Sequence, residues 1–356
     1  MNISPTVLSY NEWDPLEEVI VGVMFGAAVP EWHVTLEATV PKSNKTYFQN
    51  NAGDSFLQTY IEQAEIELNI LAKTLENEGV IVKRPSLIDH RMQFATPNWQ
   101  SAGGLYSAMP RDILMVIGDT IIEAPMAWRS RYFEFGAYRP LLKEYFLKGA
   151  KWLTGPKPQL LDELYNENFD RHDPLGTSNY AVTEFEPVFD AADFIRCGKD
   201  IFVQKSHVTN QMGIDWLTRH IGNEYRVHVI EISDSSPMHI DASFMPLAPG
   251  KLLINPMRVK KIPKQFANWE VRSAPKSTIP SSHLLYMSSS WISMNVLMLN
   301  PKTVIVEKQE QPLIDLLLSW GFDIIALEFR NVMRFGGAFH CVTCDIRRRG
   351  ILQSYF

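Results

Sequence analysis

Pairs of short apolar runs, each pair separated by turn-forming residues, recur along the chain. Glycine, aspartate, asparagine and proline between two apolar runs are typical of β-hairpins. We therefore predict four hairpins, built from residues 112–117 and 121–122, 193–197 and 201–203, 242–247 and 252–254, and 295–299 and 304–306.

Helical apolar spacing, followed by a further apolar run, appears between these hairpins. The spacing predicts helices at residues 58–71, 214–221 and 312–318, each leading to a strand, at residues 80–82, 227–230 and 324–327. The repeating unit is thus hairpin, helix, strand. The opening run at residues 17–22 could complete a fifth unit with the C-terminal segment.

The hairpin turns at Gly198, Pro249 and Asn300 are spaced 51 positions apart. Units that cannot bury their apolar faces alone must stack or close. Because the two chain ends would share one unit, we predict a closed α/β ring. An ordinary α+β domain with several hairpins is the alternative.

Composition narrows the class of protein. The chain has 356 residues, 46% of them hydrophobic and 21% charged, which is enough to bury a large core. A net charge of −6 gives no general attraction to nucleic acid or to anionic membranes. The N-terminus does not resemble a signal peptide, and no apolar run is long enough for a membrane span. We expect a cytoplasmic protein.

Cys341 follows a Gly-Gly pair and His340 and precedes the arginine run at residues 347–349. Positive charge and ordered backbone amides favour the thiolate, which is the nucleophile. With Cys344 it could also form a redox pair or half of a zinc site. Three cysteines in all, counting Cys197, do not make a disulfide framework, and nothing completes a zinc site. We expect no metal.

Carboxylates and a histidine fall beside the apolar runs. If equivalent strand ends face one cavity, these groups share it with Cys341. Carboxylates bind a planar guanidinium through two contacts, a thiolate can attack its carbon, and a histidine held by a carboxylate can protonate the leaving amine. On an extended strand His239 and Asp241 would face the same side. The candidates are Asp112, Asp190, Asp193, His239, Asp241 and Cys341.

Several segments resemble the glycine amidinotransferase family, and the match spans nearly the whole chain. They are YNEWDPLEEV at 10–19, MPRDIL at 109–114, EAPMAWRSR at 123–131, FDAADFIR at 189–196, MHIDA at 238–242, MSS at 287–289 and the segment around Cys341. The resemblance implies one domain over residues 1–356 with a five-bladed, pseudo-symmetric α/β propeller of pentein type. It also implies transfer of an amidino group from L-arginine to an amine, with release of ornithine, no cofactor and a homodimer.

The resemblance also assigns roles. Cys341 is the expected nucleophile, which forms a covalent amidino-cysteine, and Cys344 is a neighbour. The other matched positions are His239 as the acid and base, Asp190 as its partner, Asp112 and Asp241 as guanidinium ligands, Arg258 as the carboxylate ligand, and Ser288 and Ser289 as polar groups lining the site.

Two positions depart from the creatine-pathway members. Ser236 stands where those enzymes carry asparagine, close to Met238 in the expected acceptor site, and Met257 replaces an acidic residue. These departures, with the lack of a mitochondrial targeting extension, favour a bacterial enzyme of specialised-metabolite or toxin synthesis. The alternatives are a glycine amidinotransferase that makes guanidinoacetate, an arginine deiminase-like hydrolase, and a non-catalytic binding propeller.

Overall fold

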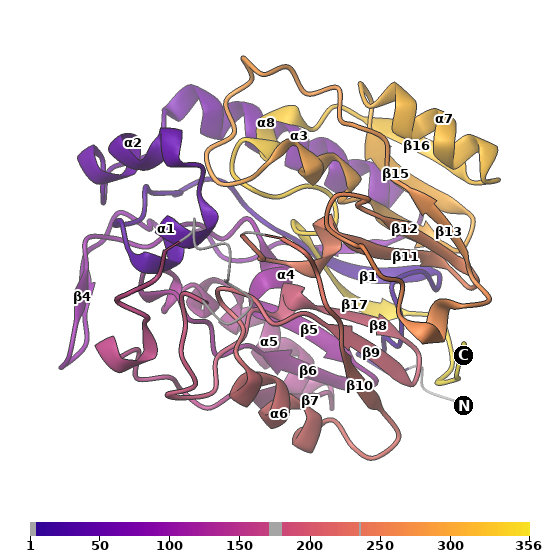
Figure 1. The fold of residues 1–356 in the computed structure, drawn as a ribbon, viewed down its shortest axis with the longest axis horizontal. Helices are drawn as coiled ribbons and strands as arrows, with labels where there is room; N and C mark the ends of the chain where they lie inside the picture. Colours follow the sequence, from indigo (N-terminus) through magenta and orange to yellow (C-terminus); the bar gives the residue numbers. More distant parts are fainter. Residues whose placement is uncertain (1–4, 171–179, 235) are drawn as a thin grey trace.

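Five three-stranded sheets and one two-stranded sheet are present in the computed structural model, which describes residues 5–170, 180–234 and 236–356 (Figure 1). In order of neighbouring strands, the sheets are β17 (Thr343–Arg348), β1 (Leu16–Val21) and β2 (Ile81–Lys83); β5 (Leu114–Ile117), β6 (Thr120–Glu123) and β7 (Lys151–Thr154); β8 (Phe194–Cys197), β9 (Asp200–Val203) and β10 (Arg226–Val229); β11 (Phe244–Ala248), β12 (Lys251–Ile254) and β13 (Glu270–Ser273); β14 (Leu297–Asn300), β15 (Thr303–Glu307) and β16 (Asp323–Leu327); and the small pair β3 (Phe94–Ala95) and β4 (Gln100–Ser101).

Each three-stranded sheet combines an antiparallel pair with a parallel third strand. The four predicted hairpins are confirmed. So is the unit shared by the chain ends, because β1 pairs with β17, with Val19 opposite Asp345 and Val21 opposite Thr343. This pairing carries the segment after Cys341 into the middle of the fold.

Helices connect the second and third strands of four sheets, since a parallel third strand needs a long crossover. They are α3 (Gln58–Asn77), α5 (Phe135–Leu147), α6 (Gln211–His220) and α7 (Gln311–Ser319). The three predicted helices are confirmed with slightly different ends. Between β12 and β13 the connection has only the short η6 (Lys264–Phe266). Other helical segments are α1 (Val34–Thr39), η1 (Lys42–Asn44), α2 (Lys45–Asn50), η2 (Arg129–Arg131), η3 (Asp162–Leu164) and α8 (Arg330–Met333).

A short helical turn precedes the first strand of four sheets. These turns are α4 (Pro110–Ile113), η4 (Ala191–Asp193), η5 (Ile240–Ala242) and η7 (Ser290–Met294). Successive turns contact one another, and α4 also contacts β17. Asp112 lies in α4 rather than in the predicted strand. The turn begins at Pro110 because proline suits the first helical position. The contacts gather the strand-end residues in one region.

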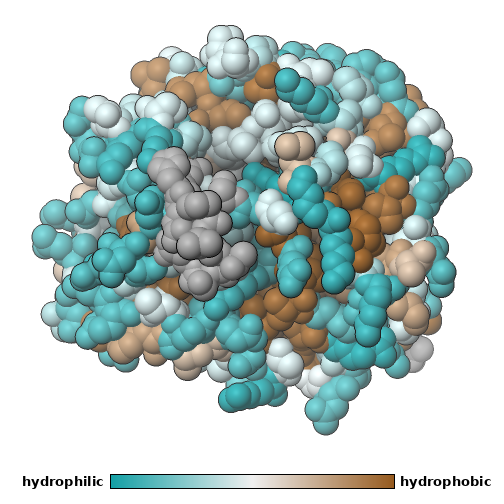
Figure 2. Space-filling model, in the orientation of Figure 1, coloured by the Kyte–Doolittle hydropathy of each residue, from teal (hydrophilic) through white to brown (hydrophobic). Residues whose placement is uncertain are grey.

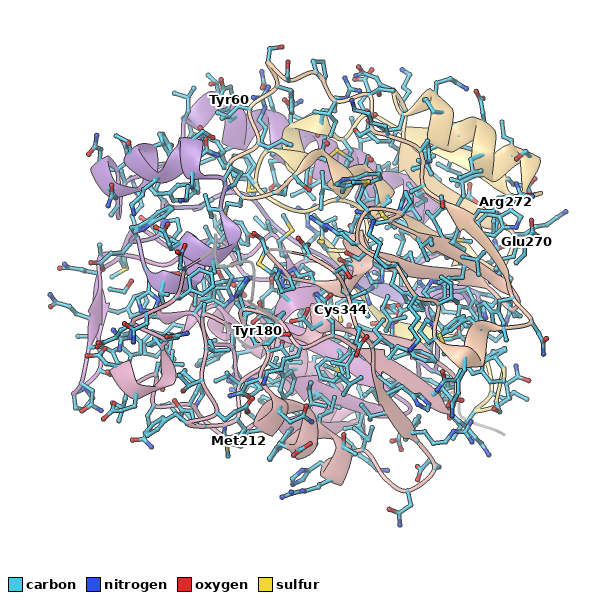
Figure 3. All side chains as sticks on the ribbon, viewed as in Figure 1. Tyr60, Tyr180, Met212, Glu270, Arg272 and Cys344 are labelled. Atoms are coloured by element: carbon cyan, nitrogen blue, oxygen red, sulfur yellow. The ribbon has the colours of Figure 1, made fainter. Side chains whose placement is uncertain are left out.

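Apolar side chains fill the spaces between the sheets and their helices. On α3, Leu68, Leu71 and Leu75 are fully buried at helical spacing against the core. Figure 2 shows hydrophilic residues over much of one face, with apolar surface exposed near its centre. In Figure 3, Cys344 lies near the middle of the fold, whereas Glu270 and Arg272 lie at its outer edge. None of the helices in the described ranges is long and apolar enough to cross a bilayer.

Candidate active site

A pocket opens over the strand-end turns. The predicted site residues line it except Asp112, Asp190 and Asp193. Asp112 and Asp190 lie against its histidine, whereas Asp193 accepts hydrogen bonds from Gln204, Ser206 and Thr209. The lining residues are Thr39, Pro41, Ser236, Met238, His239, Asp241, Ala242, Arg258, Met287, Ser288, Ser289, Ile292, Gly336 and Cys341.

Cys341 is almost fully buried, with 2% of its surface exposed. Its Sγ lies 3.7 Å from Asp241 Oδ2. Burial, followed by the charges of Asp241 and Asp112, raises the pKa of the Cys341 thiol to about 12, although His239 opposes the shift. Without a ligand, the thiol form is therefore favoured.

The arginine run does not activate Cys341, contrary to the sequence-based expectation. Arg347 pairs with Glu17 and Glu18, and Arg348 is buried against Asp345. Arg349 is exposed. The guanidinium groups of Arg347 and Arg348 lie along β17 and its neighbour β1 and form ion pairs with carboxylates there. A cation that stabilises the thiolate must come from elsewhere.

His239 caps η5 in a left-handed backbone conformation, with φ of 56°. The extended backbone that would place His239 and Asp241 on the same side is not present, since a helical turn begins directly after the histidine. Positive φ is costly for a residue with a side chain and is found most often where the surroundings enforce it. Here it aims the imidazole between two carboxylates.

The two ring nitrogens of His239 face different acids. Nε2 lies 3.0 Å from Asp190 Oδ2, and Nδ1 lies 3.6 Å from Asp112 Oδ1. Burial opposes the imidazolium, but Asp112, Asp190 and Cys341 outweigh it and raise the pKa of His239 well above its usual value. The histidine thus carries a proton that it can give to a leaving group.

The carboxylates are held by further buried groups. Trp128 Nε1 donates to Asp190 Oδ2 at 3.0 Å, and an Arg131 guanidinium nitrogen donates to Asp112 Oδ2 at 2.8 Å. Burial raises the pKa of Asp112 despite the cations of His239 and Arg131. Asp241 differs: burial opposes its ionisation, but the contacts with His340, His239 and Asn295 together outweigh burial and lower its pKa.

Some buried acceptor oxygens at this site have no hydrogen-bond donor in the described structure. They include one oxygen each of Asp112, Asp190 and Asp241. An unsatisfied buried carboxylate oxygen is costly, and a guanidinium offers several N–H donors and a positive charge. These oxygens suit a bound guanidinium.

Arg258 provides the fixed positive charge of the pocket lining. Its Nε lies 2.9 Å from Asp234 Oδ2, and its terminal nitrogens lie 3.4 Å from the hydroxyls of Ser243 and Ser289. Burial lowers the pKa of Arg258 despite Asp234. The arrangement offers a carboxylate-binding arginine beside a carboxylate that could hold an ammonium group.

Serine and methionine side chains shape the rest of the pocket. Ser236 and Ser288 each have a buried hydroxyl without a hydrogen-bond partner among the described residues. Met238 is half-buried on the wall, whereas Met257 is 61% exposed and does not line the pocket. Of the two positions that differ from the creatine-pathway members, Ser236 and Met257, only Ser236 is placed to contact a ligand.

Sequence reasoning missed Asn295 and His340. Asn295 Oδ1 accepts the backbone N–H of His340 at 3.0 Å and that of Cys341 at 3.1 Å, which fixes the backbone at Cys341. His340 Nδ1 lies 2.7 Å from Asp241 Oδ2. The signal for Asn295 was its place two residues before β14, which matches that of Asp112 before β5 and Cys341 before β17.

The cysteines have separate surroundings. All three are free and buried, and Cys344 Sγ contacts the carbonyl of Leu114 at 3.5 Å, away from the Asp241 contact of Cys341. Within the described ranges there is no group of three or more His, Cys, Asp or Glu residues arranged to hold a metal ion.

Two of the three comparisons with known proteins find relatives of this chain. No protein-family model matches the chain. L-arginine:L-lysine amidinotransferase of Pseudomonas savastanoi pv. phaseolicola is 54% identical over 98% of this chain and 96% of its own. Mitochondrial glycine amidinotransferase of Xenopus laevis is 49% identical over 98% of this chain and 85% of its own.

Solved structures agree. The amidinotransferase SxtG from the saxitoxin biosynthetic pathway of Microseira wollei is 50% identical, with a TM-score of 0.91 over 99% of this chain and 100% of its own. Inosamine-phosphate amidinotransferase of Streptomyces griseus is 36% identical, with a TM-score of 0.90 over 99% of both chains. A dimethylarginine dimethylaminohydrolase, 12% identical with a TM-score of 0.59 over 92% of this chain and 99% of its own, shares the fold alone. The chain belongs to the amidinotransferase family and is an enzyme that transfers amidino groups.

Proposed function

We propose that this enzyme moves the amidino group of L-arginine to an amine through a covalent adduct on Cys341. The observation that carries the proposal is the placement of Cys341 Sγ beside Asp241 in a pocket that also holds His239. Nucleophile, acid and guanidinium-binding carboxylates are thus within reach of one ligand.

Arginine binding uses the charges at both ends of the pocket. The free oxygens of Asp112 and Asp241 accept N–H groups of the guanidinium. At the other end, Arg258 receives the substrate carboxylate, and the hydroxyls of Ser288 and Ser289 offer hydrogen bonds to its polar atoms. These contacts hold the guanidino carbon near Cys341.

Substrate charge adds a second cation beside the thiol, next to that of His239. The two carboxylates that oppose the thiolate, Asp241 and Asp112, are the ones that bind the guanidinium. A bound cation offsets their charges and lowers the pKa of Cys341 from about 12. Cys341 therefore becomes reactive when arginine is present.

Two half-reactions follow. When arginine binds, the Cys341 thiol gives up its proton to solvent. The Sγ thiolate then bonds to the guanidino carbon, His239 gives its proton to the departing nitrogen, and the carbon–nitrogen bond breaks to release ornithine. The acceptor amine then attacks the same carbon, His239 takes a proton from it, and the carbon–sulfur bond breaks. Asp190 keeps the imidazole oriented through the 3.0 Å contact at Nε2.

The acceptor is an amine of specialised metabolism in a bacterium. Support comes from the relatives, whose names specify L-lysine and the saxitoxin pathway, and from Ser236 in place of asparagine. Glycine is the second candidate, because a glycine amidinotransferase is 49% identical. Incubation with arginine and an amine panel containing lysine and glycine, with mass detection of the guanidino product, identifies the acceptor.

Hydrolysis is the competing reaction class. Transfer predicts that multiple-turnover ornithine formation requires an amine and that no citrulline accumulates. Citrulline made from arginine and water alone would instead assign a deiminase-like activity. Running the same reaction with Cys341→Ala controls for background release.

We also propose how the fold closes and how the enzyme oligomerises. The five three-stranded units close into one propeller domain over residues 1–356, a view supported by contacts between successive strand-end turns and by the unit shared between β1 and β17. The enzyme works in the cytoplasm as a homodimer. Analytical ultracentrifugation tests the dimer, and a monomeric sedimentation coefficient at micromolar concentration would refute it.

A further inference from the structure

We propose that Glu12, which lies outside the pocket, tunes the reactivity of Cys341 through a Glu12–His340–Asp241 chain. Glu12 is a positioning residue in this scheme, since it touches neither the ligand pocket nor the thiol. The inference deepens the proposed function and rests on Cys341 as its nucleophile.

Both ring nitrogens of His340 face carboxylates. Nδ1 lies 2.7 Å from Asp241 Oδ2, and Nε2 lies 3.1 Å from Glu12 Oε2. A neutral imidazole has one N–H and can donate to only one of these acids, whereas the imidazolium donates to both. The double contact therefore favours a positive charge on His340.

The Glu12 end of the Glu12–His340–Asp241 series is held in place by two arginines. Arg196 donates to both Glu12 oxygens, at 2.8 and 2.7 Å, and Arg111 contacts Glu12 at 3.4 Å. Arg111 Nε also donates to the backbone oxygen of His340 at 2.9 Å. Burial opposes ionisation of Glu12, but the charge of Arg196 and the hydrogen bonds from His340 and Arg196 outweigh it and hold the pKa of Glu12 well below its usual value. The ionised Glu12 therefore fixes the ring of His340 at Nε2.

The Asp241 end of the Glu12–His340–Asp241 series lies beside the Cys341 thiol. Asp241 Oδ2 accepts from His340 and also lies 3.7 Å from Cys341 Sγ. A positive His340 offsets the charge of Asp241, which otherwise disfavours the thiolate. Losing the Glu12 charge should let His340 become neutral, so that Asp241 opposes the thiolate more strongly.

Other charged groups near the chain are common to all variants. Asp112 and His239 act on Cys341, while Arg111, Arg196 and Asp345 surround Glu12. If His340 kept its charge regardless of Glu12, removing the Glu12 charge would make the thiolate slightly more stable. The two possibilities therefore predict rate changes of opposite sign.

The test is the rate of Cys341 alkylation by iodoacetamide, without arginine, from pH 7 to 10, located by peptide mass spectrometry. With Glu12→Gln we expect alkylation about tenfold slower at each pH, equivalent to about one unit of thiol pKa. His340→Asn, which can still donate to Asp241 but carries no charge, should slow it similarly. This readout does not depend on amidino transfer, so its failure is distinct from failure of the proposed function.

Glu18→Gln is the matched control. Glu18 is also buried, accepts from Tyr145 at 2.9 Å and Arg347 at 3.0 Å, and does not contact the pocket. It should leave the alkylation rate unchanged. Alkylation that is unchanged or faster in folded Glu12→Gln, or unchanged in folded His340→Asn, overturns the proposal; circular dichroism establishes folding for each variant.

Discussion

Asp190 Oδ2 accepts hydrogen bonds from both His239 Nε2 and Trp128 Nε1, each at 3.0 Å. The oxygen is fully buried, so the tryptophan fixes the carboxylate and the carboxylate fixes the imidazole. This relationship leaves Nδ1 of His239 directed toward Asp112 and the pocket. It explains how a histidine in a left-handed backbone conformation can have one defined orientation.

Replacing Asp190 with asparagine should reduce ornithine release from arginine by about 100-fold or more, because the acid–base group loses its orientation and charge partner. Asp193→Asn is the matched control, since Asp193 is equally buried but bonds to Gln204, Ser206 and Thr209. We expect it to affect unfolding more than turnover. Equal losses of turnover in the two variants would show that burial alone matters.

Charge on the ligand should determine thiol reactivity. Because the pKa of Cys341 is raised to about 12, the thiolate fraction of the free enzyme rises with pH throughout the range from 7 to 10. Chloroacetamidine, which is cationic, should alkylate Cys341 faster than neutral chloroacetamide by a larger ratio than on free cysteine, and with a shallower pH dependence. Equal ratios on enzyme and free cysteine would remove the role given to Asp112 and Asp241.

Arg258→Met should raise the KM for arginine about 10- to 100-fold, because a charge-assisted hydrogen bond contributes about 1.5–3 kcal/mol. Methylguanidine, which has no carboxylate, serves as the control substrate in the same steady-state assay. Its turnover should change little. A parallel loss for both substrates would place the effect of Arg258 on the chemistry or the fold instead.

Arg196→Met should lower the free energy of unfolding by about 3–5 kcal/mol, since it leaves Glu12 and Asp345 buried with fewer cations. Urea unfolding followed by circular dichroism measures the change. Arg272→Met is the control, because Arg272 lies at the outer edge, pairs with exposed Glu270 and should cost about 1 kcal/mol or less (Figure 3). Equal decreases in the free energy of unfolding of the two variants would show that the buried ion pairs of Arg196 with Glu12 and Asp345 stabilise the fold no more than a surface pair does.

Much of the fold followed from local pattern. Apolar runs around Gly198, Pro249 and Asn300 indicated hairpins because these turns satisfy short-range rules, and the structure has them. The union of the two chain ends was also predictable, because each end had an unpaired apolar strand. The second sheet's helix, α5, was not predicted, and its interior Pro140 weakens the helical signal.

The site was predictable where residue type determines chemistry. Cys341, His239 and the aspartates could be proposed, but their contacts depend on long-range packing. No local rule shows that Glu12 meets His340, or that Arg348 turns away from Cys341 toward Asp345. The left-handed φ of His239 also escaped prediction, since it is imposed by its surroundings rather than by its residue type.

The central claim is a covalent amidino group on Cys341. Enzyme mixed with L-arginine in the absence of an acceptor, quenched in acid and digested, should yield a Cys341 peptide heavier by one amidino group, with up to one ornithine released per active site. Adding the acceptor amine before the quench should remove the adduct, and Cys341→Ala should form none. An unmodified Cys341 peptide, with ornithine released only when both substrates are bound, would contradict the account.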